Sequence, residues 1–238
     1  MRRGTFYLIP VPLGAASPPE AVLPPPVLET LRGLRHFVVE NAKSARAFLK
    51  GAAMPTPLQS LSLAELNEHT PAAMLPALLA PIREGHDLGL LSEAGCPAVA
   101  DPGAALVALA QAESLRVVPC VGPSALLLAL MASGLEGQRF AFHGYLPARA
   151  EARRSAIRKL EAASRARDET QLFIETPYRN QALFATLLET AHPDTRLCLA
   201  IDITLATESI QTRTIANWKR QPPPDLERRP TVFLLSCG

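Results

Sequence analysis

Short apolar runs alternate with segments of helical character along the first half of the chain. Four connecting helices are expected, at 27–32, 44–50, 71–84 and 104–112, with Ser44 capping the second and Thr70 opening the third. The apolar runs that predict strands are 5–9, 36–39, 58–61, 88–91 and 116–119. Strands that alternate with helices in this way predict a largely parallel sheet.

The second half of the chain follows a looser pattern. It begins with a very apolar helix at 125–132 and contains a basic helix at 150–163 and a further helix ending near 190. Its predicted strands are 138–143, 171–174, 196–201, 208–212 and 231–236, the last in mixed pairing. The best boundary lies near Gly122. The sequence therefore predicts two α/β domains, residues 1–121 with a mostly parallel sheet and residues 122–238 with a mixed sheet.

Composition narrows the class of protein without naming a partner. Of the 238 residues, 48% are hydrophobic and 19% charged, which is typical of globular domains, and the net charge of +2 is too small to indicate a ligand. The four cysteines lack the spacing of a metal site, so no metal is expected, and they fit a reduced, cytoplasmic protein. The first apolar run is short and ends at Pro10, which favours a strand over a signal peptide. No apolar stretch approaches the ~20 residues that span a bilayer.

A loop of small residues follows the strand at 88–91 and contains Ser92, Glu93 and Asp101. Polar residues also follow three other predicted strands, at 40–41, 175–176 and 202–204. Because the carboxyl ends of parallel strands gather at one edge of a sheet, these groups predict a ligand site there. Phosphate loops of the G-x-x-x-x-G-K-[ST] and G-x-G-x-x-G types are absent, which disfavours a pyrophosphate cofactor, and no G-x-S-x-G elbow is present. S-adenosylmethionine, which has no phosphate, suits such a loop.

Several motifs follow one another along the chain: Ser92–Pro97, Asp101–Gly103, Gly122–Ala125, Phe173–Arg179 and Ala200–Thr204. In this order they resemble the tetrapyrrole methylase superfamily, and within it the ribosomal RNA small-subunit methyltransferase I branch, which methylates a cytidine 2′-hydroxyl. The resemblance implies a homodimer of two-domain subunits, with S-adenosylmethionine in the cleft between the domains. The cofactor contacts that it implies are Pro10, Leu13, Ser92, Glu93, Gly95, Val99, Ser124, Ala125, Phe173 and Ala200.

The chain departs from this branch mainly on the acceptor side. Glu40-Asn41-Ala42-Lys43 stands where the branch usually has Glu-Asp-Thr-Arg, Glu93 replaces an Asp, and Tyr178 replaces a His. Glu40 is the candidate general base or acceptor orienter, with Asn41 beside it as the second catalytic candidate. The alternative for Glu40 is a strand-end carboxylate paired with Lys43 or Arg46.

The leading hypothesis is a cytoplasmic S-adenosylmethionine-dependent methyltransferase that modifies a ribose hydroxyl of ribosomal RNA or of the small ribosomal subunit. Arg153, Arg154 and Arg158 of the basic helix, together with Arg179, are the candidates for binding RNA phosphate, and a solvated helix face is the alternative. Two other functions stay open. One is methylation of a small, tetrapyrrole-like molecule, and the other is S-adenosylmethionine binding without catalysis, which Asn41 keeps possible.

Overall fold

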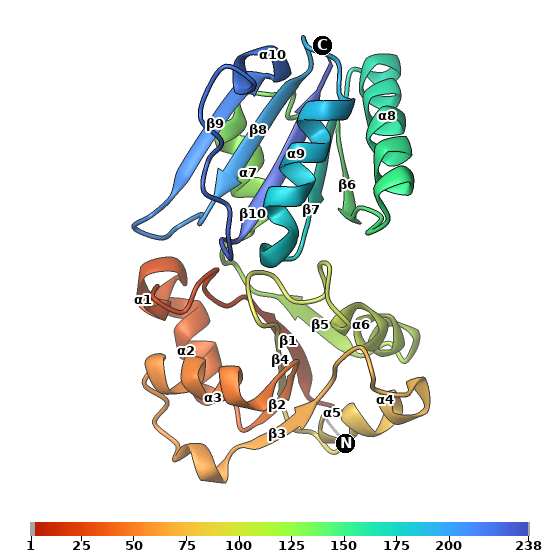
Figure 1. Ribbon diagram of the computed structural model, residues 1–238. Coiled ribbons are helices and arrows are strands. Elements are labelled where there is room, and N and C mark those ends of the chain that lie inside the picture. Colours follow the sequence, from red (N-terminus) through yellow and green to blue (C-terminus); the bar gives the residue numbers. More distant parts are fainter. Residues whose placement is uncertain (1–2, 238) are drawn as a thin grey trace. The chain divides into compact units, whose positions relative to one another are not determined.

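The computed structural model describes residues 3–237, which form two compact units (Figure 1). The first unit ends at Ser124 and the second begins at Ala125. This division falls three residues after the boundary expected from sequence. Among the described residues, no helix has the length and apolar character needed to cross a membrane.

The sheet of the first unit is entirely parallel. Its strands are ordered β3-β2-β4-β1-β5, which places β4 at its centre, between β2 and β1. The bounds are β1 (Thr5–Ile9), β2 (His36–Val39), β3 (Ser62–Glu65), β4 (Leu88–Leu91) and β5 (Arg116–Pro119). All four residues of β4 are buried, as expected for a strand covered on both faces.

Helices cover both faces of this sheet and bury two separate apolar clusters. One cluster joins α1 (Pro19–Val22), α2 (Pro25–Gly33) and α3 (Ala42–Gly51) to residues such as Ile9, Phe37 and Leu91. The other joins α4 (Leu75–Leu78), α5 (Ala80–Arg83) and α6 (Gly103–Ala112) to Phe6, Val38 and Leu90. The β strands thus supply alternate side chains to opposite faces.

Prolines explain where the first unit departs from the expected elements. The strand expected at 58–61 is wrong: Leu58–Ser60 form a 3₁₀ turn in which Ser60 N–H donates to Pro57 O, and β3 follows it. The single helix expected at 71–84 is also wrong, since the chain forms a 3₁₀ turn at Ala72–Met74 and then α4 and α5. Pro76 and Pro81 open these two short helices, because a proline fits the first turn and disrupts a helix interior.

The second unit has a mixed sheet in the order β6-β7-β10-β8-β9. β6 and β7 are parallel, and β10 is antiparallel to both of its neighbours. In Figure 1, α8 (Ala150–Arg167) and α9 (Asn180–Thr190) lie on one face and α7 (Ala125–Ser133) on the other. The remaining bounds are β6 (Phe140–Tyr145), β7 (Thr170–Ile174), β8 (Arg196–Ile201), β9 (Ser209–Thr214), α10 (Ile215–Trp218) and β10 (Thr231–Ser236).

Aromatic packing fixes the core beneath α8 and α9. Phe173 and Phe233 stack across neighbouring strands with their ring centroids 5.7 Å apart. Phe184 meets Trp218 edge-on at 5.6 Å, and the Trp218 indole N–H donates to Leu197 O. Because β10 runs antiparallel between β7 and β8, the first residues of β10 lie at the edge where β7 and β8 end. This edge carries the polar residues at 175–176 and 202–204.

Candidate active site

Loops after three strands of the first unit converge at its carboxyl edge. Val11 and Gly95 form an isolated antiparallel bridge with two hydrogen bonds, of 2.9 and 3.1 Å, between their backbones. Gly95 has φ +73°, a conformation that glycine adopts without strain, and a Cβ there would lie 3.2 Å from the Leu13 side chain. The loops after β1 and β4, which contain Pro10, Leu13, Ser92, Glu93 and Gly95, are therefore held together.

The loop after β5 joins this group. A Cβ on Gly122 would lie 2.5 Å from Pro10 Cβ, so the close approach of these two loops requires glycine. The Cys96 thiol donates to Pro123 O across 3.4 Å. Ser124 follows Pro123 directly and Ala125 opens α7. The structure thus brings together the loops of the first unit that carry the sequence-predicted cofactor residues.

The end of the β4 loop holds Val99 in an exposed position. Ala98 and Ala100 have φ values of +65° and +59°, which a non-glycine residue adopts only at a cost in free energy. Asp101 fixes this conformation, since its Oδ1 accepts from Ala98 N–H at 2.8 Å and Gly103 N–H at 2.7 Å. Burial raises the pKa of Asp101 above its ordinary value. The loop therefore presents an apolar side chain, 50% exposed, at the predicted cofactor position.

Glu40 lies at the end of β2, beside the same loop. Its Oε2 accepts a hydrogen bond from Glu93 N–H at 3.3 Å. Burial raises the pKa of Glu40 above 4.5, the nearby charges of Glu93, Asp101 and Glu68 raise it further, and the bond from Glu93 N–H lowers it. Among residues 3–237 no ion pair joins Glu40 to a basic side chain, so pairing with Lys43 or Arg46 is not what holds it.

Asn41 caps helix α3. Its Oδ1 accepts from Lys43 N–H at 2.8 Å and Ser44 N–H at 3.2 Å, which satisfies two of the free donors at the helix start. The cap expected at Ser44 is therefore wrong, because the helix begins at Ala42. The Ser44 hydroxyl instead lies near Asn41 O, at 3.1 Å, and the Glu93 carboxylate, at 3.3 Å.

In the second unit, two of the three predicted cofactor residues are buried, and Ala125 is half-buried. Phe173 and Ala200 are 0% exposed and lie within β7 and β8. The exposed fraction covers the whole residue, so neither the backbone nor the side chain of these two residues is open to a ligand. Polar residues follow both strands, Glu175 after β7 and Asp202 after β8.

Glu175 is a buried carboxylate that holds Arg179. Its Oε1 accepts from Arg179 Nε at 3.0 Å and Nη2 at 2.7 Å, and from Thr176 N–H at 2.7 Å. Its Oε2 is buried and has no hydrogen-bond partner among the described residues. Two of the Arg179 nitrogens are thus engaged within the chain, which leaves less of this guanidinium for the RNA contact predicted from sequence.

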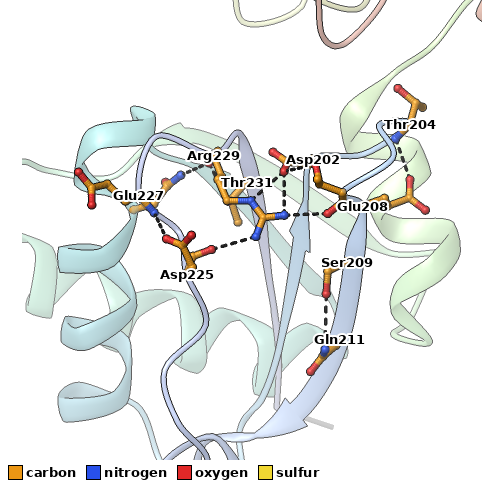
Figure 2. Close-up of polar contacts among 11 residues, drawn as sticks. Asp202, Thr204, Glu208, Ser209, Gln211, Asp225, Glu227, Arg229 and Thr231 are labelled. Atoms are coloured by element: carbon orange, nitrogen blue, oxygen red, sulfur yellow. Dashed lines mark hydrogen bonds and ion pairs between the residues drawn. The ribbon is translucent and has the colours of Figure 1, made fainter. Parts of the chain in front are cut away.

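An ion pair that sequence reasoning missed organises the end of β8 (Figure 2). Asp202 Oδ2 accepts from Arg229 Nε at 2.8 Å and Nη2 at 2.7 Å, and also from the Thr207 hydroxyl. Asp202 and Thr204 have φ values of +49° and +70°, and the Thr204 hydroxyl is buried without a partner. Arg229 lies 27 residues along the chain from Asp202, and no local motif connects the two.

The basic residues of α8 differ in their surroundings: some are buried or paired within the chain, and others are exposed. Arg153 is only 8% exposed, and its Nε is buried without a partner. Arg154 bonds Glu151 at 2.7 Å and Glu189 at 3.2 Å. Arg158 and Lys159 are exposed. The spacing of Arg153, Ile157, Leu160 and Ser164 could have shown that Arg153 belongs to the buried stripe of α8.

These residues fit S-adenosylmethionine as a cofactor. The carboxylates that raise the pKa of Glu40 favour a positive charge nearby, and the cofactor carries a sulfonium cation. In the second unit, taken by itself, the unpartnered acceptors at Glu175 and Thr204 suit a ligand rich in hydroxyl and amino donors. The glycine-dependent approach of the loops at Gly95 and Gly122 suits contact through backbone atoms.

Comparisons with known proteins agree with this chemistry. No family model matches the chain. A Pseudomonas aeruginosa protein named ribosomal RNA small subunit methyltransferase I is 31% identical over 216 residues, covering 91% of this chain and 72% of that protein. The Xylella fastidiosa protein of the same name is 31% identical over 233 residues, covering 98% and 80%.

The fold is also found among solved structures. The crystal structure of the methyltransferase CobJ matches with a TM-score of 0.63 at 20% sequence identity, covering 99% of this chain and 94% of that one. This similarity confirms the α/β fold that the sequence predicts, with its parallel and mixed sheets.

Proposed function

The chain belongs to the ribosomal RNA small subunit methyltransferase I family and is an S-adenosylmethionine-dependent methyltransferase, and we propose that it methylates a ribose 2′-hydroxyl of small-subunit ribosomal RNA. When bound, S-adenosylmethionine supplies a methyl group that its sulfonium already activates. The chain's own residues must therefore bind and orient the acceptor and remove its proton.

The position of Glu40 carries this proposal. The bond from Glu93 N–H fixes Glu40 Oε2, while Oε1 has no hydrogen-bond partner among residues 3–237. Its raised pKa makes the ionised carboxylate a stronger base than an ordinary glutamate. We assign Oε1 the role of orienting the acceptor hydroxyl and accepting its proton. Asn41 then acts on the site indirectly, by capping the helix that begins next to Glu40.

We assign cofactor binding to the loops of the first unit and to the strand ends of the second. Leu13, Gly95, Val99 and Ser124 are supported by the convergence of the loops that carry them. Phe173 and Ala200 lie in the strands whose ends we assign to the cofactor, but both residues are fully buried, so they are not themselves assigned a contact. Ser92 and Glu93 connect this group to Glu40.

We assign RNA phosphate binding to the solvent-facing side of α8. Arg158 and Lys159 are exposed, and Arg165 and Arg167 extend the basic surface to the end of the helix. The exposed pair supports the proposal better than the buried Arg153 or the paired Arg154. Action on ribosomal RNA would place the protein in the cytoplasm.

We further propose a homodimer formed through α7. This helix is apolar along its length, yet only Ala129, Leu130 and Ser133 are buried. Met131, on this helix, is 79% exposed. A second copy offers an identical apolar surface across a two-fold axis. Met131→Glu should convert a dimer to a monomer in sedimentation analysis, and an unchanged mass would refute this interface.

The two alternative functions lose their support in different ways. Asn41 kept the non-catalytic alternative open because it lacks the charge of Asp, but its side chain serves as a helix cap, for which Asn and Asp are equivalent. The tetrapyrrole alternative has only similarity of fold on its side, as with CobJ at 20% identity.

Calorimetry and a transfer assay test the proposal together. S-adenosylmethionine binding is measured first, and labelled methyl transfer to small ribosomal subunits lacking this modification is measured next. Glu40→Gln should bind the cofactor within about twofold of the unsubstituted protein but lose about 100-fold or more in transfer. Glu84→Gln, an exposed glutamate outside the site, is the matched control and should change neither. Cofactor binding without any transfer by the unsubstituted protein would favour the non-catalytic alternative.

A further inference from the structure

A cavity of about 460 Å³ lies within the first unit, beside Glu93. Part of its lining comes from the connection after β1, which includes Pro12 and Pro18, and from Pro19 at the start of α1. A second part is a stripe of α3 that contains Ser44, Phe48 and Gly51. Ser92 and Glu93, from the loop after β4, also line it. The volume lies in the range of small-molecule sites in proteins, about 300–1,000 Å³.

The walls suit a flat, largely apolar group. Proline rings and one aromatic side chain, Phe48, supply apolar surface, and half of the other lining residues are Gly or Ala. Nucleobases stack favourably on aromatic side chains. The cavity therefore has the size and the surface to hold one base.

The charge of the cavity determines which edge the ligand presents. None of its lining residues, all of them described, is Lys, Arg or His, so a phosphate is disfavoured inside it. The one charged group is the Glu93 carboxylate, which lies 3.3 Å from the Ser44 hydroxyl. A carboxylate accepts hydrogen bonds and has none to donate, so it favours a ligand edge that carries N–H groups.

We propose that this cavity, here named the Phe48 cavity, binds the base of the acceptor nucleotide, with Glu93 accepting a hydrogen bond from an exocyclic amino group. The inference rests on the proposed function and names the residues that select the base. Phe48 supplies the stacking surface, and Ser44 orients the Glu93 carboxylate through their hydrogen bond.

The position of Glu40 indicates that the Phe48 cavity holds part of the acceptor and not part of the cofactor. The same residue, Glu93, donates its backbone N–H to Glu40 and places its side chain in the cavity. A nucleoside whose base occupies the Phe48 cavity would therefore have its ribose near Glu40. The base and the reacting hydroxyl are then two ends of one ligand held by adjacent groups.

This arrangement distinguishes cytosine from uracil. The amino group of cytosine donates to a carboxylate, whereas uracil presents a carbonyl oxygen at the same position, which a carboxylate repels. One such contact should make cytidine bind about tenfold or more tightly than uridine.

The test measures binding of cytidine and uridine by NMR, with S-adenosylhomocysteine present to fill the cofactor site. Ala47→Phe fills the cavity from an exposed position of α3, and Lys50→Phe adds the same bulk outside it as a matched control. Ala47→Phe should weaken cytidine binding at least tenfold, and Lys50→Phe should leave it within twofold. Glu93→Gln should bring cytidine and uridine within about twofold of each other. Phe48→Leu, which keeps apolar packing without the ring, should weaken both nucleosides.

Three results would overturn the inference. The first is equal binding of cytidine and uridine by the unsubstituted protein, and the second is cytidine binding that Ala47→Phe does not change. The third is a tenfold loss of S-adenosylhomocysteine binding in Ala47→Phe, because the cavity would then hold the adenine of the cofactor. None of these readings requires methyl transfer. Cytidine binding in the cavity without ribosomal RNA methylation would therefore contradict the proposed function alone.

Discussion

The backbone N–H of Glu93 donates to Oε2 of Glu40 across 3.3 Å, which joins the ends of β4 and β2 at one point. The two strands are neighbours in the parallel sheet, so their carboxyl ends meet although 53 residues separate these two positions. The same contact orients one oxygen of Glu40 and leaves the other for a ligand. Glu40 and the loop of Glu93 therefore act as one site.

The rate of methyl transfer should rise with pH as the Glu40 carboxyl ionises. Burial and neighbouring carboxylates raise its pKa in the folded protein, so the folded state binds more protons than the unfolded state just above pH 4.5. Stability from this group therefore falls as pH rises from 4.5 through the raised pKa, while the basic form needed for transfer accumulates. Rates and unfolding free energies measured across this range should show both trends, and Glu40→Gln should abolish both. An unchanged acidic limb in Glu40→Gln would assign it to another group.

Asn41 should matter for stability through its amide oxygen. Asn41→Ala removes the cap of α3 and should lower the free energy of unfolding by about 1 kcal/mol. Asn41→Asp keeps an acceptor in place and should lower the free energy of unfolding by no more than about 0.3 kcal/mol. Urea denaturation measures both variants. A larger loss in Asn41→Asp than in Asn41→Ala would show that the cap is not the role of this residue.

Arg229 should stabilise the segment that follows β8 through its ion pair with Asp202. Its guanidinium bonds Asp202, which has a nearly buried side chain, and also Thr207 O (Figure 2). Arg229→Ala leaves that carboxylate without its partner and should cost about 3 kcal/mol of unfolding free energy. Arg229→Lys keeps the charge and should recover part of the loss. A change below 1 kcal/mol in Arg229→Ala would show that Asp202 is held by other groups.

The exposed face of α8 should determine how RNA binding depends on salt. Replacing both Arg158 and Lys159 by Ala should weaken RNA binding and reduce the slope of log affinity against log salt by about 1 to 2. The double variant Lys219→Ala and Arg220→Ala, also exposed, is the control and should keep the slope. Filter binding at several salt concentrations gives these slopes. Equal slopes in both double variants would show that RNA phosphate is not bound by this face of α8.

Much of the fold follows from short-range pattern. The apolar runs at 5–9, 88–91 and 231–236 form strands at the expected residues. The departures come from proline chemistry, as at Pro57 and Pro76, where one ring decides between a turn and a longer regular element. Hydrophobic periodicity alone does not account for the effect of proline on where an element begins or ends.

The site was predictable at the level of loops and strand ends, but not at the level of side-chain partners. The parallel order of strands places Glu40 near Glu93, and this follows from the rule that strand ends gather at one edge. The Asp202–Arg229 pair joins segments that no local pattern links, so only the folded chain shows it. Asn41 looks like a lost charge in the sequence and is a helix cap in the structure.

The most direct test of the account is to locate the transferred methyl group. Small ribosomal subunits that lack the modification are incubated with the protein and labelled S-adenosylmethionine, and the RNA is then hydrolysed with alkali. A 2′-O-methyl group removes the hydroxyl that alkaline cleavage requires, so label should appear in alkali-resistant dinucleotides, and Glu40→Gln should yield almost none. Label in alkali-sensitive mononucleotides would place the methyl group on a base and contradict the assignment of Glu40 to a ribose hydroxyl.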